Sequence, residues 1–169
     1  MKAVLSLISI FISSVCFSQP ADINIERLVK DRNKEIVSGG SEKKLVVFNE
    51  KGSIRVPENY SNKRTGTIDS ERGEITGPAL MVGYDIGYMA GTHIGPLQLK
   101  QFNSYYNSVV NGENAWIGVT KDKLVVTIWD PAKRDIAAFP ANFWATVKSG
   151  DDIVEALKII FTYKAKTEQ

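Results

Sequence analysis

Residues 79–89, ALMVGYDIGYM, constrain the fold of this chain more than any other stretch. Successive side chains of a β-strand point to opposite faces. As a strand, this stretch carries two glycines, Gly83 and Gly87, on either side of Asp85 on one face, with a methionine at each end. The other face holds only large apolar or aromatic side chains: Leu80, Val82, Tyr84, Ile86 and Tyr88. The alternation predicts an extended segment with a core-facing side and a nearly bare side.

The bare side of this strand has two interpretations. Glycine within a strand often marks the close approach of another group. One interpretation is that a large side chain fills the strip, and three tryptophans have the size for it: Trp116, Trp129 and Trp144. The other is a shallow groove for a ligand or partner, with Asp85 as its polar anchor between Gly83 and Gly87.

The first eighteen residues are predicted to be a cleaved signal peptide. A positive start precedes an apolar run that is too short to span a bilayer comfortably. Small residues lie just before Gln19, so we expect cleavage between Ser18 and Gln19 and export to the periplasm or the medium. The alternative is a lipid anchor on Cys16, although Val15 stands where that processing prefers a small residue.

Removal of the signal leaves 169 − 18 = 151 residues, enough for one domain with a substantial core. We expect a polar lead-in at 19–43, either a marginal helix or a loose arm, followed by an α+β domain at 44–169. No second apolar run reaches the length of a transmembrane helix. The chain's only cysteine leaves with the signal, so the mature protein has no disulfide and no cysteine metal ligand. Its charge balance of 20 − 19 = +1, with scattered charges, argues against nucleic-acid binding.

Short apolar runs elsewhere in the chain predict the rest of an antiparallel sheet. The expected strands are 45–48, 53–57, a hairpin of 116–119 with 124–129, and 142–147. The segment 97–110 fits either a short helix or a late strand, and 161–164 alternates enough for a short closing strand. Because both faces of 124–129 are apolar, we expect that strand to be central.

One amphipathic helix is predicted near the C-terminus, at 149–160. The Ser149 hydroxyl can accept a hydrogen bond from the backbone N–H of Asp152, and the Asp152 carboxylate can accept one from the backbone N–H of Ser149. These two bonds make a capping box. Four residues then repeat at helical spacing on one face: Ile153, Ala156, Leu157 and Ile160. We therefore expect this helix to pack on one face of the sheet.

Nucleophilic catalysis has one candidate set, formed by Ser70 and His93, the chain's only histidine. A serine nucleophile usually lies on a tight turn between glycines, as in G-x-S-x-G, and Ser70 in TIDSERG lacks that context. A hydrolase built on a carboxylate pair, Asp85 with Asp69 or Asp130, is also conceivable. We expect Ser70 and His93 to be turn and loop residues instead.

Metal and phosphate sites are not predicted. One histidine and no mature cysteine exclude the common zinc sets, and no acidic run has the spacing of a calcium loop. The repeat GYDIGYMAGTHIG matches neither the dinucleotide-binding glycine motif nor the P-loop, and its charged residues do not suit a membrane helix. The sequence therefore predicts no cofactor.

Two stretches resemble the PsbP-like family of small exported domains. SIRVPENY is similar to the entry strand of that family, and DDIVEALKIIFTYK is similar to its closing helix and strand. The resemblance implies an antiparallel sheet packed with helices and an accessory or binding role, and it implies no functional residue.

We accordingly expect a single α+β domain whose antiparallel sheet is packed on one face by the C-terminal helix. The expected function is that of an exported binding or accessory protein without catalytic activity, acting on an unknown protein or small ligand. The alternatives are the Ser70/His93 or carboxylate hydrolase, and an inhibitor or immunity-type protein that presents residues 130–140 as a protruding loop.

Overall fold

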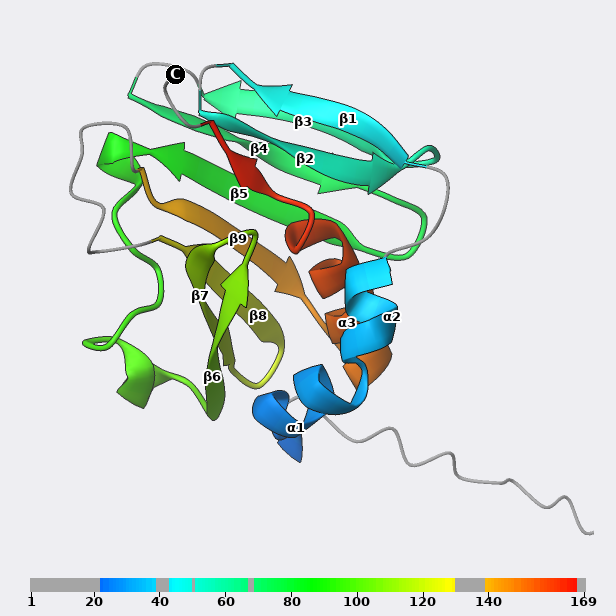
Figure 1. Ribbon diagram of the computed structural model, residues 1–169, viewed down its shortest axis with the longest axis vertical. Helices are drawn as coiled ribbons and strands as arrows, with labels where there is room; N and C mark the ends of the chain where they lie inside the picture. Colours follow the sequence, from blue (N-terminus) through cyan, green and yellow to red (C-terminus); the bar gives the residue numbers. More distant parts are fainter. Residues whose placement is uncertain (1–21, 39–42, 50, 67–68, 130–138, 167–169) are drawn as a thin grey trace, which may run out of the picture.

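A computed structural model describes residues 22–38, 43–49, 51–66, 69–129 and 139–166 of the chain. These residues form one α+β domain with two antiparallel sheets and three α-helices, which confirms the predicted fold class (Figure 1). The signal peptide, its cleavage site between Ser18 and Gln19, and Cys16 lie outside the described residues. Among the described helices, none combines the length and apolar character needed to cross a bilayer.

The larger sheet contains seven strands in the order β3-β4-β5-β9-β8-β7-β6. The predicted 116–129 hairpin is confirmed as β7 paired with β8, and β8 lies between β7 and β9 as its two apolar faces indicate. The segment 97–110 ends as a strand, β6. The seven strands are β3 (Ser61–Gly66), β4 (Ser70–Thr76), β5 (Met81–Gly87), β6 (Ser104–Val110), β7 (Glu113–Val119), β8 (Lys123–Ile128) and β9 (Ala141–Thr146).

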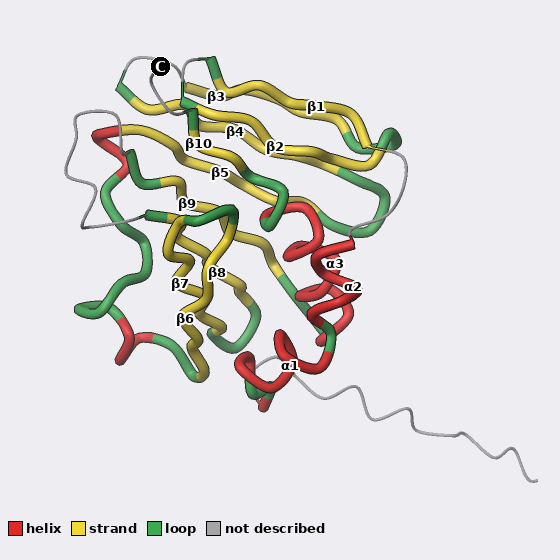
Figure 2. Tube along the Cα trace, viewed as in Figure 1, coloured by secondary structure: helices red, strands yellow, loops and turns green. Residues whose placement is uncertain are grey.

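The smaller sheet contains β1 (Lys43–Phe48), β2 (Gly52–Pro57) and β10 (Lys164–Ala165), with β2 in the middle. The expected single sheet is thus divided in two, because β1, β2 and β10 pair only among themselves and not with the strands of the larger sheet. The two sheets meet through Phe48, whose ring centroid lies 4.7 Å from that of Tyr84 on β5. Figures 1 and 2 show the smaller sheet lying against one end of the larger one.

Strand β5 has the predicted core face, but it is shorter than expected. Val82, Tyr84 and Ile86 are fully buried, and Leu80, just before the strand, is buried as well. The expectation that Tyr88 joins them is wrong, because its side chain is 78% exposed. Gly87 has a φ of 148°, which ends the strand and turns Tyr88 into the short 3₁₀ helix η2 (Tyr88–Ala90).

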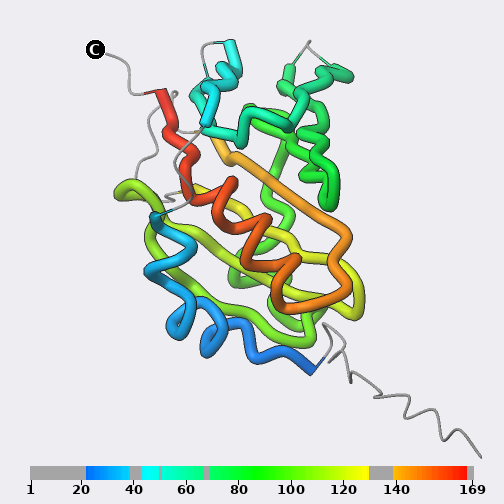
Figure 3. The backbone as a smooth tube through the Cα atoms, turned by 90° about the vertical axis from the view of Figure 1, so that its right-hand side faces the viewer, coloured from blue at the N-terminus to red at the C-terminus, as the bar shows by residue number. Residues whose placement is uncertain are grey.

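Helix α3 (Gly150–Ile160) begins with the predicted capping box. The Asp152 amide donates to the Ser149 hydroxyl at 3.2 Å, and the Ser149 amide donates to the Asp152 carboxylate at 3.1 Å. Its apolar residues join the core with those of β5, β8 and β9. Figure 3 shows the helix crossing this side of the larger sheet, which we call the inner face. The opposite side, where Gly83 and Asp85 point, is called the outer face.

The lead-in forms two short helices, α1 (Ile25–Asp31) and α2 (Asn33–Ser38). Ile25 and Ile36 are buried in the core, although most residues of this segment are polar. Helix α2 lies beside α3, where Glu35 on α2 bonds to Arg32 and Lys158. These two cations lower the pKa of Glu35 to about 2, and the bond to Lys158 links α2 with α3.

Candidate functional site

A row of polar side chains crosses the outer face of the larger sheet. Arg72 on β4 lies opposite Asp85 on β5, Asp85 lies opposite Asn142 on β9, and Asn142 lies opposite Thr127 on β8. Asp85, Asn142 and Thr127 are fully buried. Buried polar groups carry a cost unless they are hydrogen-bonded, so their partners indicate what this row does.

Asp85 balances its charge with Arg72. Its Oδ2 accepts from the Arg72 Nε at 3.1 Å and also from Nη2, while its Oδ1 has no hydrogen-bond partner within the described residues. The Arg72 side chain is 60% exposed, so the arginine side of this ion pair is in contact with solvent. Asp85 is therefore one half of an ion pair, and its second carboxylate oxygen is buried without a hydrogen-bond partner among the described residues.

The glycines beside Asp85 allow close approach, as their positions suggested. A Cβ on Gly83 would lie 2.3 Å from the ring of Trp144, so the tryptophan lies flat on this glycine. A Cβ on Gly87 would lie 2.8 Å from the backbone oxygen of Asp69. Of the three tryptophans considered, Trp144 is the one that covers the bare side of β5 at Gly83. The ligand groove proposed at Asp85, Gly83 and Gly87 stays a prediction.

Asn142 and Thr127 hold the long connection between β5 and β6 on the sheet. The Asn142 Oδ1 accepts from the His93 amide at 2.9 Å and from the Thr127 hydroxyl at 2.6 Å, and its Nδ2 donates to the Gly91 carbonyl at 2.9 Å. The Thr127 hydroxyl oxygen also accepts from the Ile94 amide at 3.1 Å. Two buried side chains thus satisfy backbone groups of an irregular segment, residues 88–103, which we call the outer loop.

Apolar contacts fix the same loop beside this network. A Cβ on Gly118 of β7 would lie 2.4 Å from the Ile94 Cδ1 and 2.5 Å from the Phe102 Cδ1. Ile94 is fully buried as a result. The His93 ring lies 5.5 Å from that of Trp144, centroid to centroid. The outer loop is therefore anchored at its middle and at its end.

The anchored loop displays large apolar side chains to solvent. Tyr88 is 78% exposed, Met89 67% and Leu97 90%. Single exposed apolar residues are common and need no explanation. All three lie on one loop that buried polar side chains attach to the sheet, and we call these three side chains together the loop surface.

The structure does not join Ser70 and His93 by a hydrogen bond. Ser70 begins β4 opposite Gly87, so the expectation that it is a turn residue is wrong. His93 lies on the outer loop, as expected, in a hollow of about 350 Å³ with Phe102, Lys123 and other residues. Within the described residues, the only hydrogen bond of His93 is made by its backbone amide. Burial lowers the pKa of His93, more than the nearby Asp85 raises it, and so favours the neutral imidazole at neutral pH.

The carboxylate pairs considered with Asp85 stay a prediction, since Asp130 lies outside the described residues. Glu71, the other buried acid, points to the inner face, where the Arg64 Nε lies 2.9 Å from its Oε1 without forming a directed hydrogen bond. Asp130 and residues 130–138 of the loop considered for an inhibitor lie outside the described residues. Across the described ranges, no three acidic, histidine or cysteine side chains gather closely enough to hold a metal ion.

Comparison with known proteins returned no match to a family model, a curated protein or a solved structure. The resemblance to PsbP-like domains stays a prediction.

Arg72, Asn142 and Thr127 were missed by sequence reasoning. Asn142 and Thr127 lie in strands that were expected from their apolar residues, whereas Arg72 lies in β4, which was not expected as a strand. Nothing local distinguishes the three from ordinary polar positions. Only the strand register brings them into one row with Asp85. The outer loop likewise looked irregular in sequence, and its single useful signal was Gly118 in an otherwise apolar strand.

Proposed function

We propose that this protein is an exported, non-catalytic binding protein that captures a protein partner through the loop surface. The observation that carries the proposal is the use of two fully buried polar side chains, Asn142 and Thr127, to fix a loop that exposes Tyr88, Met89 and Leu97. Export rests on the predicted signal peptide.

Physical considerations favour a protein partner for this surface. Large aromatic and apolar side chains dominate the energetics of protein interfaces. A loop that is already ordered loses little conformational entropy when it binds, so its apolar contacts contribute more of their free energy to affinity. The exposed Arg72 beside the buried Asp85 adds a charged group on the same face.

The proposal is tested by a comparative pull-down from the native compartment. The bait is the mature protein, and the test variant carries Tyr88→Ser and Leu97→Ser. The matched control carries Leu45→Ser and Val47→Ser, which remove two exposed apolar side chains from the smaller sheet. We expect the same partner with the wild type and the control, and at least a tenfold loss with the test variant.

Circular dichroism spectra and thermal melts of all three proteins distinguish a variant that fails to fold from one that folds but does not bind. Equal recovery of the partner by the test variant, or no specific partner at any salt concentration, would contradict the proposal.

A further inference from the structure

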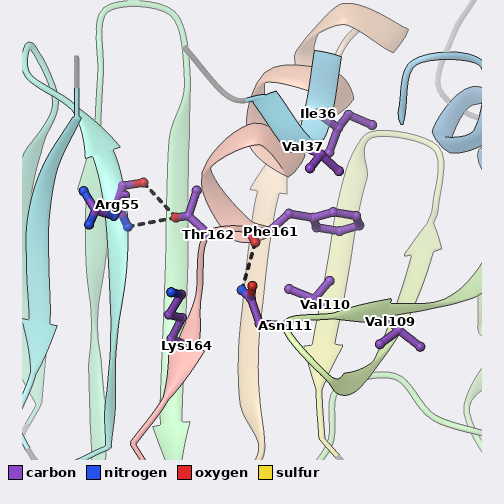
Figure 4. A pocket seen from close by; sticks show the side chains of 9 residues that line it. All are labelled: Ile36, Val37, Arg55, Val109, Val110, Asn111, Phe161, Thr162 and Lys164. Carbon is purple, nitrogen blue, oxygen red and sulfur yellow. Dashed lines mark hydrogen bonds between the residues drawn. The ribbon is translucent and has the colours of Figure 1, made fainter. Parts of the chain in front are cut away.

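A groove of about 360 Å³ opens where α2, the β6–β7 hairpin and the end of α3 meet the smaller sheet (Figure 4). It lies on a different part of the molecule from the loop surface. We call it the cationic groove, and its lining is Ile36, Val37, Arg55, Val109, Val110, Asn111, Phe161, Thr162 and Lys164.

The lining divides by chemistry. Figure 4 shows Arg55 and Lys164 together on one side of the groove, and Val37 and Val109 on the other side, with Phe161 and Asn111 between them. Val37 and Val109 are 67% and 64% exposed, although they come from elements far apart in the sequence. The groove is thus polar at one end and apolar at the other.

The two cations have no carboxylate partner within the described residues. By contrast, Arg32, Arg64, Arg72 and Lys158 each lie within salt-bridge distance of an acid. Lys43 on the neighbouring strand adds a third positive charge near Arg55; its ammonium donates to the Lys158 carbonyl and also interacts with Glu155. Arg55 and Lys164 therefore place two positive charges at this end of the groove, and such charges attract anions.

Hydrogen bonds hold the walls in place. The Asn111 Nδ2 donates to the carbonyls of Phe161 and Tyr163, at 3.2 and 2.6 Å, and this ties the hairpin tip to the end of α3. The Thr162 hydroxyl accepts from the Arg55 amide at 2.8 Å, which ties the same segment to β2. These bonds also satisfy carbonyls at the negative end of the helix, where an anion would otherwise be repelled. Ligand sites are usually formed in advance in this way.

We propose that the cationic groove binds a single-chain aliphatic carboxylate of medium length. The carboxylate lies at Arg55 and Lys164, where guanidinium and ammonium groups donate charge-assisted hydrogen bonds. The chain runs along Phe161 and the valines of α2 and β6. The volume lies near the lower limit of about 300 Å³ for small-molecule sites, which fits one chain and not a two-chain lipid.

The test uses dodecanoate below its micelle concentration and the mature protein, followed by backbone NMR and isothermal titration calorimetry. We expect saturable binding, with shifts at Val109, Asn111 and Phe161 and none at the outer loop. Dodecanol, which keeps the chain but lacks the charge, and butyrate, which keeps the charge but shortens the chain, should each bind at least tenfold more weakly.

Variants separate the two ends of the groove. Arg55→Gln with Lys164→Gln should weaken dodecanoate binding at least tenfold, whereas the matched control, Lys121→Gln with Lys148→Gln, removes the same charge elsewhere and should leave it unchanged. Val109→Ser should weaken binding of the long chain but not change that of butyrate.

Four results would overturn the inference. These are no saturable binding, equal affinity in the Arg55/Lys164 variant, shifts confined to another surface, and a preference for acidic peptides over dodecanoate, which would indicate a peptide site. None of these results depends on capture of a protein at the loop surface, so this inference and the proposed function fail separately.

Discussion

Replacement of Asn142 by leucine should release the outer loop from the sheet while the sheet stays folded. Leucine is close to asparagine in size but has no polar atoms, so it removes the amide's bonds to His93, Gly91 and Thr127 and leaves little room for a water to replace them. The loop amides lose their partners, whereas the strand pairing of β9 uses backbone groups and is retained.

The size of the effect follows from the groups left unpaired. An orphaned buried donor or acceptor costs about 1–3 kcal/mol. Two backbone groups, the His93 N–H and the Gly91 carbonyl, lose their only described partner, so opening of the loop should become easier by about 2–6 kcal/mol. That corresponds to an opening constant larger by about 30-fold to about 20,000-fold.

Amide hydrogen exchange measured by NMR reports this opening directly. The amides of His93 and Ile94 should exchange faster by this factor in the Asn142→Leu protein, while amides of β5 and β8 change much less. Asn107→Leu is the matched control, because Asn107 lies on the same face but is exposed. Unchanged protection of His93 and Ile94, or an equal loss across the whole sheet, would refute the reasoning.

Three further changes test other parts of the structure. Burial raises the pKa of Glu71, so the folded state binds the proton more tightly than the unfolded state, and stability falls as pH rises from the ordinary value to the raised one. Glu71→Gln should therefore stabilise the protein near pH 7 but not near pH 4 in urea melts, and a pH-independent difference would contradict this. Gly118→Val should displace Ile94 and Phe102 at a cost of about 1–3 kcal/mol, seen as a lower melting temperature; an unchanged melt would show that the loop does not lie on this glycine. Ser149→Ala removes the cap of α3 and should cost about 1 kcal/mol in thermal unfolding, with Ser38→Ala as the control at an exposed helix end.

Much of the fold was predictable because local patterns determine it. The alternation around Tyr84, the 116–129 hairpin and the capping box at Ser149 each depend on residues close in sequence, and the structure confirms all three. The division into two sheets was not predictable, since pairing of β10 with β2 joins residues about a hundred positions apart. The error at Tyr88 arose because a strand pattern does not reveal where a glycine turns the chain.

The candidate site was only partly predictable. Asp85 and Gly83 stood out because a carboxylate between glycines is unusual on a strand. Asn142 and Thr127 did not, since their role comes from register and from an irregular loop that follows no periodic pattern. The tryptophan at Gly83 was one of three candidates, and only the pairing of Gly83 with Trp144 decides between them.

Site-specific photo-crosslinking in the native compartment tests the central claim most directly. A photoreactive residue replaces Leu97 on the loop surface in one protein and Leu45 on the smaller sheet in another, both exposed positions. The account predicts a discrete adduct with one partner from position 97, lost when Asn142→Leu frees the loop, and no such adduct from position 45. The same adducts from both positions, or an adduct at position 97 that survives release of the loop, would contradict it.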